Sequence, residues 1–158
     1  MLQSEKDRTI KQIASNRRAY HDYLIVRTVE AGIMLQGTEV KSLREGKCSM
    51  QDCYAAFKSH DSLELFLLNL HISPYSHGNR ENHEPKRSRK LLVNRNESVK
   101  LKTAVSEKGV TLIPLSIYFS GPYIKVEIGL AKAKRKYDKR ESVKERETER
   151  EIRKKYHE

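Results

Sequence analysis

The chain has 158 residues and a formal net charge of +11, with 34% charged and 37% hydrophobic residues. This length fits one domain of ordinary size, and the charge points to nucleic acid, an anionic membrane or an acidic partner. No apolar run approaches the roughly 18 residues that a membrane span needs, and residues 1–12 lack the apolar stretch of a secretory signal, so we expect a cytoplasmic protein with no membrane partner.

The first third of the chain predicts a short helix between extended segments. Residues 1–18 are polar and leave room only for a short helical turn. A β-rich run begins at Tyr23, and a turn at residues 30–32 leads into a second extended segment. Residues 38–45 lie between two glycines and carry apolar residues three positions apart. This spacing predicts a short helix packed over the end of a barrel or sheet.

The middle of the chain predicts a hairpin, a long loop and a helix. The runs Cys53–Phe57 and Leu63–Leu68 are separated by a turn and predict an antiparallel hairpin. Residues 75–90 are polar and without periodicity, and loops this long in a compact domain are usually functional. A helical pattern then runs from residue 94 or 96 to 108, with Gly109 where a C-cap glycine belongs.

The clearest strand signals come last. Apolar and other residues alternate over 113–119 and over 124–130, on either side of a turn, which predicts a half-buried antiparallel hairpin. Pro114 suggests an edge or the first residues of its strand. Together these elements predict a mainly β fold: an antiparallel OB-like barrel of about six strands with two or three short flanking helices.

Motifs for metal binding and catalysis are missing from the sequence. Cys48 and Cys53 have no second cysteine pair, and the histidines show no ligand spacing, so we expect no metal and no cofactor. The glycines are dispersed and no nucleophile elbow is visible, so we expect no enzyme. Glu39 and Asp52 stand near basic residues and predict structural ion pairs.

Three basic segments carry the functional signal. Residues 16–18 and 79–90 are rich in Lys, Arg and amides, a composition that suits phosphates and irregular RNA. Residues 132–158 hold twelve Lys or Arg against seven Asp or Glu, with too few apolar residues to form a core. We therefore divide the chain into a barrel domain, 1–131, and a basic tail, 132–158, disordered when free and helical along RNA. A merely solubilising tail is the alternative.

Four stretches resemble one protein family: RAYHDY (18–23), EAGIMLQGTEVKSLREGK (30–47), HISPYSHGNRENHEPKRSRKLL (71–92) and KVEIGLAKAKRKYDKRESVKERE (125–147). In this order they cover nearly the whole chain and resemble the SsrA-binding (SmpB) proteins, the bacterial partners of transfer-messenger RNA (tmRNA). The resemblance implies an OB-type barrel that binds the tRNA-like domain of tmRNA, promotes its aminoacylation and delivers it to stalled ribosomes for trans-translation. It also implies that the tail follows the empty mRNA channel past the small-subunit decoding centre, and that no enzyme activity is involved.

By motif position, the resemblance assigns RNA binding to four residues: Asn16, Glu30, Leu92 and Lys125. It adds six basic residues as electrostatic support: Arg17, Arg18, Lys86, Arg87, Arg89 and Lys90. It assigns contacts with the ribosome to seven tail residues: Lys132, Lys134, Lys136, Tyr137, Asp138, Lys139 and Arg140. Tyr137 is expected to stack on an rRNA base, and the free protein is expected to be a monomer. A structural protein bound permanently to rRNA, and an RNA-modifying enzyme, are the alternatives.

Overall fold

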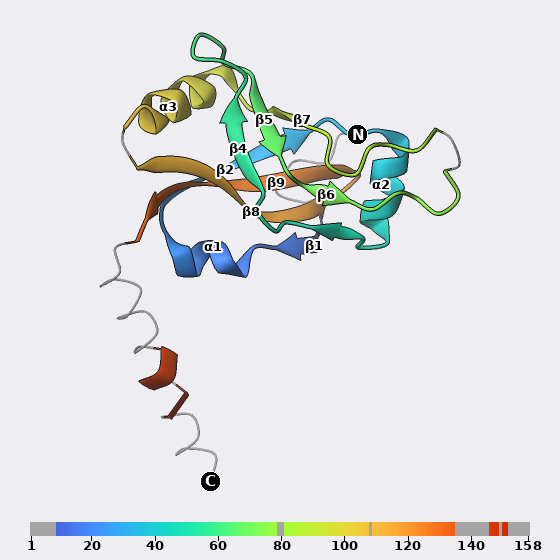
Figure 1. Cartoon of the computed structure of the whole chain (residues 1–158), viewed down its shortest axis with the longest axis horizontal. Coiled ribbons are helices and arrows are strands. Elements are labelled where there is room, and N and C mark those ends of the chain that lie inside the picture. Colours follow the sequence, from blue (N-terminus) through green and yellow to red (C-terminus); the bar gives the residue numbers. More distant parts are fainter. Residues whose placement is uncertain (1–8, 79–80, 108, 135–145, 149, 152–158) are drawn as a thin grey trace.

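The computed structural model describes residues 9–78, 81–107, 109–134, 146–148 and 150–151 (Figure 1). Between residues 10 and 133, the described chain forms three helices and nine strands in this order: β1 (Ile10–Ser15), α1 (Arg17–Asp22), β2 (Tyr23–Ile33), α2 (Gly37–Arg44), β3 (Cys48–Ser49), β4 (Tyr54–Phe57), β5 (Leu65–Leu68), β6 (His71–Ile72), β7 (Arg89–Leu92), α3 (Arg95–Val105), β8 (Val110–Ser120) and β9 (Tyr123–Ala133).

Six of these strands close into an antiparallel barrel, in the order β8-β4-β5-β7-β2-β9 and back to β8. β1 lies on the same edge of β8 as β4, but farther along the strand, while β3 and β6 form a small separate ladder. Closure removes the open sheet edges that would otherwise need protection. The prediction of a mainly β, OB-like barrel of about six strands with short flanking helices is confirmed.

β8 and β9 form one long hairpin that turns at Gly121, where φ is +58°. A bulge between Pro114 and Ser116 shifts the register, so the two sides of β8 exchange faces there. Leu112 and Ile117 consequently lie in the main core, whereas Ile113 and Leu115 join a second cluster beneath α1. The hairpin is as predicted, but the apolar residues 113, 115, 117 and 119 do not share one face, because the bulge separates them. Pro114 is not among the first residues of β8 and lies between the stretches that pair with β4 and with β1. A proline at a bulge removes no regular ladder bond.

Two further predictions fail because distant strands provide the pairing. Residues 10–15 form β1 on β8 and not a helical turn, with Ile10 opposite Ser120 and Ser15 opposite Ser116. The expected turn at residues 30–32 is absent, because β2 runs on without a break between β7 and β9. Gly32 marks a close approach instead: a Cβ there would lie 3.3 Å from the Cβ of Leu92.

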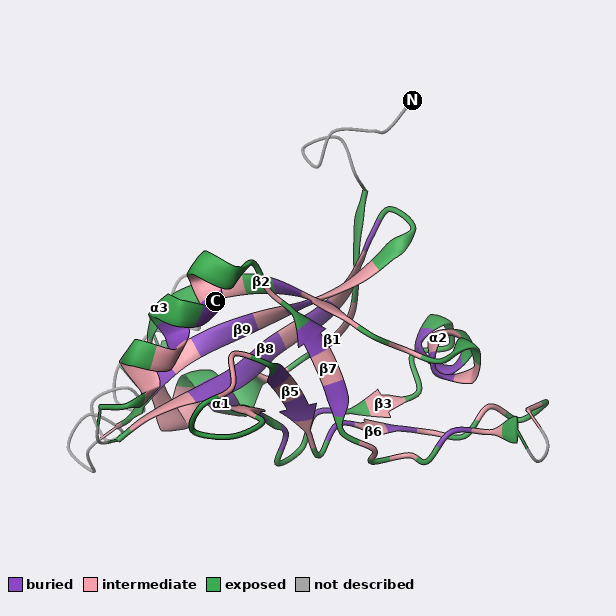
Figure 2. Ribbon diagram, turned by 90° about the horizontal axis from the view of Figure 1, so that it is seen from above, coloured by how far each residue is buried: buried purple, intermediate pink, exposed green. Residues whose placement is uncertain are grey.

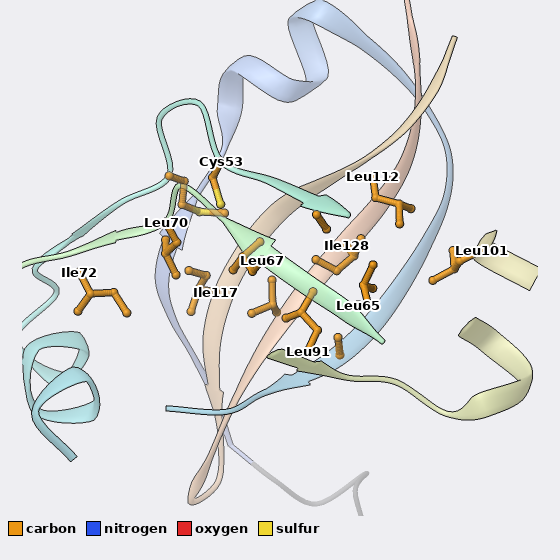
Figure 3. Close-up of a cluster of buried hydrophobic side chains, with 14 of the residues drawn as sticks. Cys53, Leu65, Leu67, Leu70, Ile72, Leu91, Leu101, Leu112, Ile117 and Ile128 are labelled. Atoms are coloured by element: carbon orange, nitrogen blue, oxygen red, sulfur yellow. The ribbon is translucent and has the colours of Figure 1, made fainter. Parts of the chain in front are cut away.

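The main core fills the barrel with aliphatic side chains (Figure 3). Leu65, Leu67, Leu112, Ile117 and Ile128 are all less than 2% exposed. Burial of such side chains contributes roughly 1.5–3 kcal/mol each, which lets a chain without Trp hold a stable core.

The helices close the barrel from different sides (Figure 2). α2 forms as predicted, and α3 begins after Asn94 but ends at Val105, three residues before the predicted residue 108. α3 buries Ser98 and Leu101, so a serine takes part in its packed face. Among the described residues, no helix combines the length and apolar character needed to cross a membrane.

The close packing of Gly129 against the bulge yields a stability prediction. A Cβ at Gly129 would lie 3.0 Å from Cδ1 of the buried Leu115. Gly129→Ala should therefore lower the free energy of unfolding by about 1–3 kcal/mol, measured by urea denaturation. Gly37→Ala is the matched control, because no heavy atom lies within 4 Å of its added Cβ. Equal stability of the two variants would contradict this account of the bulge.

Candidate nucleic-acid interface

A continuous row of residues crosses the outer face of the barrel. Leu92 on β7, Gly32 on β2, Lys125 on β9, Tyr118 on β8 and Gln12 on β1 are successive partners in the strand register. Residues directly opposite each other on antiparallel strands point to the same face. The neighbours of this row in each barrel strand lie in the core, so the row itself faces outward. We call it the cross-sheet row.

Glu30 stands beside the row, two residues before Gly32 on β2. Its carboxylate accepts a hydrogen bond from the Tyr118 hydroxyl, and its Oε1 lies 3.9 Å from Nζ of Lys125. The side chain of Glu30 is 49% exposed and that of Lys125 is 22% exposed. Directly across from Glu30 lies Glu127, whose Oε2 accepts a hydrogen bond of 3.2 Å from Ser116. Three of the four principal RNA-binding candidates, Glu30, Leu92 and Lys125, are thus brought together on one surface.

The fourth candidate, Asn16, lies at the start of α1. Its Oδ1 accepts a hydrogen bond from the Ala19 N–H at 3.2 Å, and its Nδ2 donates to the Pro114 carbonyl at 3.1 Å. Asn16 therefore caps α1 and ties it to β8. Arg17 and Arg18 follow and line a depression between α1 and the β3–β4 turn.

Both arginine side chains of α1 are exposed. Arg17 is exposed, and the Arg18 side chain is 80% exposed although its Nε lies 3.2 Å from the Asp22 carboxylate. Both guanidinium groups are therefore placed at the surface, as electrostatic support requires, and their contact with RNA stays a prediction.

In the basic loop, residues 79–90, the structure corrects the assignment of Arg89. Arg89, expected to support RNA binding, is fully buried and forms an ion pair with Glu39 of α2. It also donates hydrogen bonds to the carbonyls of Leu70 at 2.6 Å and Pro85 at 3.1 Å. Because every face of this guanidinium is enclosed by protein, Arg89 is a structural residue and no RNA contact.

Arg87 shares the same carboxylate. Its Nε donates to Oε1 of Glu39 at 3.0 Å, and its side chain is 26% exposed. The prediction that Glu39 forms a structural ion pair is confirmed. Burial by itself would raise the pKa of Glu39, but hydrogen bonds from Arg87, the Gln36 N–H and Arg89, together with the charge of Arg89, lower it below its usual value.

The amide and imidazole of the loop also face inward. Asn82 donates to the Tyr75 carbonyl at 2.7 Å and accepts from the Tyr75 N–H at 3.0 Å. His83 is buried, with Nε2 2.8 Å from the Ile72 carbonyl and Nδ1 2.9 Å from the Thr38 hydroxyl. These side chains fix the loop, so the suggestion that its amides and histidines suit RNA does not apply to Asn82 and His83.

The two lysines of the loop remain at the surface. Lys86 is exposed. Lys90 shares the outward face of β7 with Leu92, and its Nζ lies 3.4 Å from Oε1 of Glu64. Since Arg87 and Arg89 are engaged by Glu39, Lys86 and Lys90 are the cations among the described loop residues that are placed to meet a phosphate.

The ribosome candidates divide into two groups. Lys132 belongs to β9, and Lys134 follows it, with a backbone N–H bonded to the Asp22 carbonyl at 3.1 Å and Nζ bonded to the Tyr20 carbonyl at 3.0 Å. Ordered structure thus continues past the boundary predicted at 131/132. The other five candidates, Lys136, Tyr137, Asp138, Lys139 and Arg140, lie outside the described residues, as does most of the tail whose disorder was predicted. Within it, residues 146–148 and 150–151 are helical.

Sequence reasoning did not name Tyr118, Ser116 or Glu127 as site residues. The alternating pattern had placed all three among the polar side of the hairpin, and that was the only available signal. Their role depends on β2, which brings Glu30 next to Glu127 from far away in the sequence. Register between distant strands cannot be derived from local alternation.

Metal chemistry finds no support in the part of the chain that the structure describes. No group of three or more His, Cys, Asp or Glu side chains gathers there to hold a metal ion. Burial raises the pKa of the Cys48 thiol, and it raises the pKa of the Cys53 thiol to about 12. Both thiols are therefore protonated at neutral pH and suit packing better than metal ligation.

Comparison with known proteins decides the family. The model of the SmpB protein family matches residues 13–158. The chain belongs to the SmpB family. The SsrA-binding protein of Carboxydothermus hydrogenoformans is 54% identical over 144 residues, covering 91% of this chain and 95% of its own length. The SsrA-binding protein of Geobacillus kaustophilus is 52% identical over 142 residues, covering 90% of both chains.

A solved SmpB-family structure shares the fold. The chain from the structure described as "tmRNA-SmpB: a journey to the center of the bacterial ribosome" superimposes with a TM-score of 0.64 at 48% identity. The match covers 82% of this chain and 93% of the other. The barrel described above is thus the fold of an SmpB protein.

The buried ion pair of this SmpB-family chain yields a stability prediction. Glu39→Gln leaves the buried Arg89 without its counter-charge, so the free energy of unfolding at neutral pH should fall by about 3–5 kcal/mol. The pKa of Glu39 is lower in the folded chain than in the unfolded chain. Its contribution is therefore present above the unfolded value of about 4.3 and is lost as the pH falls through the folded value.

Urea denaturation at neutral pH and at roughly pH 3 measures both effects. Wild type should lose more stability than Glu39→Gln on acidification, since the variant has no such carboxylate to protonate. Glu45→Gln is the control, because Glu45 is 40% exposed beside Lys47 and its replacement should cost no more than about 0.5 kcal/mol. A Glu39→Gln chain as stable as wild type would refute the structural role of the pair.

Proposed function

We propose that the outer face of the barrel binds the tRNA-like domain of tmRNA, and that the chain promotes its aminoacylation and delivers it to stalled ribosomes for trans-translation. It acts as a binding protein and not as an enzyme, in the cytoplasm where ribosomes work. The observation that carries this proposal is the cross-sheet row, in which Leu92 and Lys125 flank Gly32 with Glu30 alongside. The SsrA-binding relatives and the tmRNA-SmpB structure support it.

The row combines three kinds of recognition. The Lys125 ammonium can neutralise a phosphate, which positions RNA without reading its sequence. The Glu30 carboxylate repels phosphate but accepts hydrogen bonds from a base N–H or a ribose 2′-hydroxyl. Leu92, 52% exposed next to the bare backbone of Gly32, offers a flat apolar surface to a base or sugar. Such a mixture fits irregular RNA better than a uniform run of phosphates.

Cations around the face add attraction that does not depend on sequence. Arg17 and Arg18 extend from α1, and Lys86 and Lys90 extend from the loop and β7. Each phosphate that they neutralise releases counterions, which strengthens binding most at low salt. Asn16 supports this surface by capping the helix that carries the two arginines.

The tail acts on the ribosome. Lys132 and Lys134 begin this segment beside α1, at a place on the barrel separate from the cross-sheet row. The residues from Lys136 to Arg140 carry further positive charge and one ring, Tyr137, which suits stacking on an rRNA base. The mRNA channel past the decoding centre is the partner assigned to this segment.

The barrel assignment predicts two distinguishable losses of affinity. Lys125→Ala should weaken binding to the tRNA-like domain and lower the slope of log K against log salt by roughly one. Leu92→Ala should weaken binding without changing that slope, since it removes no charge. Gel shifts over a range of stated salt concentrations measure both quantities.

Lys100→Ala serves as the charge-matched control, because Lys100 is exposed on α3, outside both the row and the basic loop. It should leave affinity almost unchanged. An rRNA fragment of equal length tests preference at the same salt. Equal affinity of wild type for both RNAs would contradict the proposal and favour a structural rRNA-binding protein.

The tail assignment predicts a separation of activities. A chain ending after Lys134 retains β9 and its bonds to α1, so it should bind the tRNA-like domain nearly as well as wild type. It should fail to tag nascent peptides on stalled ribosomes, as should full-length Tyr137→Ala to a lesser degree. Circular dichroism checks that the barrel is intact. A truncated chain that still supports tagging would show that the tail is not needed.

A further inference from the structure

We propose that Tyr118 is a positioning residue for RNA recognition: its hydroxyl holds the Glu30 carboxylate so that Glu30 and Lys125 both stay available to RNA. The inference rests on the proposed function and deepens it. It concerns a side chain that belongs to the cross-sheet row but is not itself required to touch the ligand.

Tyr118 reaches Glu30 across an intervening strand. Tyr118 on β8 is the register partner of Lys125 on β9, which is in turn the partner of Gly32 on β2. Glu30 lies two residues from Gly32 on the same face of β2. The phenol therefore extends diagonally over β9 to donate its hydrogen bond to the carboxylate. Few side chains other than tyrosine are long enough to span this distance and end in a neutral donor.

The hydroxyl competes with Lys125 for the same acceptor. A lysine and a carboxylate that bind each other directly come within about 2.7–2.9 Å. Here Nζ of Lys125 stays 3.9 Å from Glu30, beyond hydrogen-bond range, while the hydroxyl occupies the other oxygen. The ammonium thus keeps donors for a phosphate, and Oε1 of Glu30 keeps lone pairs for a donor on the RNA.

The chemistry of the phenol suits this task. Burial raises the pKa of Tyr118, and its hydrogen bond to Glu30 and the negative charges of Glu30 and Glu127 act in the same direction. The phenol therefore keeps its proton, and remains a donor, throughout the physiological range. A charged donor in this place would neutralise Glu30, whereas a hydroxyl orients it and leaves its charge intact.

A second hydroxyl on β8 donates a hydrogen bond to the neighbouring carboxylate, that of Glu127. Glu127 lies directly opposite Glu30, and like charges in such a cross-strand pair repel each other. Ser116, two positions before Tyr118 on β8, donates a hydrogen bond of 3.2 Å to Glu127. Two hydroxyls on one strand thus hold two opposed carboxylates, each by its Oε2 atom. The repetition indicates that β8 orients the acidic groups of this face.

Removal of the hydroxyl should let Glu30 and Lys125 pair with each other. Tyr118→Phe should then weaken binding to the tRNA-like domain by roughly tenfold, the scale of one hydrogen bond to a charged group. It should also lower the salt slope by up to roughly one, because Lys125 no longer meets a phosphate. A merely structural role for Tyr118 would not change the number of phosphate contacts.

The decisive comparison is made in backgrounds that lack the Glu30 charge. In Glu30→Ala and Glu30→Gln chains, Tyr118→Phe should change affinity by less than about twofold and restore the wild-type salt slope, because no carboxylate remains to capture Lys125. Tyr54→Phe is the matched control: it removes an exposed hydroxyl from β4, three strands from β2 around the barrel, and should change neither quantity. Full-length chains and urea denaturation are used throughout, so that any loss of folding is seen.

Two results would overturn the inference. Tyr118→Phe could bind as wild type does, in which case weak binding by Tyr118→Leu would show that the ring itself contacts RNA. Alternatively, Tyr118→Phe could lose the same affinity with and without Glu30. Failure of the proposed function gives a different result, namely a wild-type chain with no preference for the tRNA-like domain. Variant-to-wild-type ratios on the same RNA would still decide the role of Tyr118.

Discussion

The structure depends on β8, the barrel strand that pairs with three other strands. One edge binds β9 along its whole length and closes the barrel, while the other binds β4 and then β1. Inward residues of this strand fill the core, and its outward Ser116 and Tyr118 hold the carboxylates of the outer face. The bulge at Leu115 lets the same strand also form the floor beneath α1. Closure of the barrel and the geometry of the interface therefore have one origin.

The buried carboxylate of Glu39 supplies a second constraint. Taking it and Arg89 out of water is costly, and the hydrogen bonds to Arg87, Leu70 and Pro85 offset that cost. No buried side-chain nitrogen or oxygen in the described chain lacks a hydrogen-bond partner. The result joins α2, the loop and β7 into one unit. The pair removes one positive and one negative charge from the surface together, so it leaves the net charge of +11 unchanged while withdrawing Arg89 from the basic loop.

Local sequence patterns predicted the elements whose pairing or packing involves residues close together in the sequence. The β8–β9 hairpin alternates clearly, and α2 and the β4–β5 hairpin follow the same logic. Features that depend on a distant partner could not be derived this way. The sequence pattern around Gly32 predicts a turn, because the strand partner Leu92 is distant in sequence. Arg89 is a structural residue and Lys90 a surface residue because Arg89 pairs with Glu39, fifty positions away. Resemblance to the family named Glu30, Leu92 and Lys125 of the candidate surface. It did not name Ser116 and Tyr118, whose hydroxyls hold the carboxylates.

In the proposed function, the outer face has to give preference for one RNA as well as attraction to RNA in general. Positive charge attracts every RNA equally, so charge alone gives affinity without preference. Two glutamates in the middle of the face repel a phosphate placed there and favour a group that donates hydrogen bonds instead. Such carboxylates can discriminate only if their oxygens stay open to RNA, and the 3.9 Å between Nζ of Lys125 and Oε1 of Glu30 is too long for a direct hydrogen bond. In the proposed function, preference therefore follows from an ion pair that is close but not hydrogen-bonded.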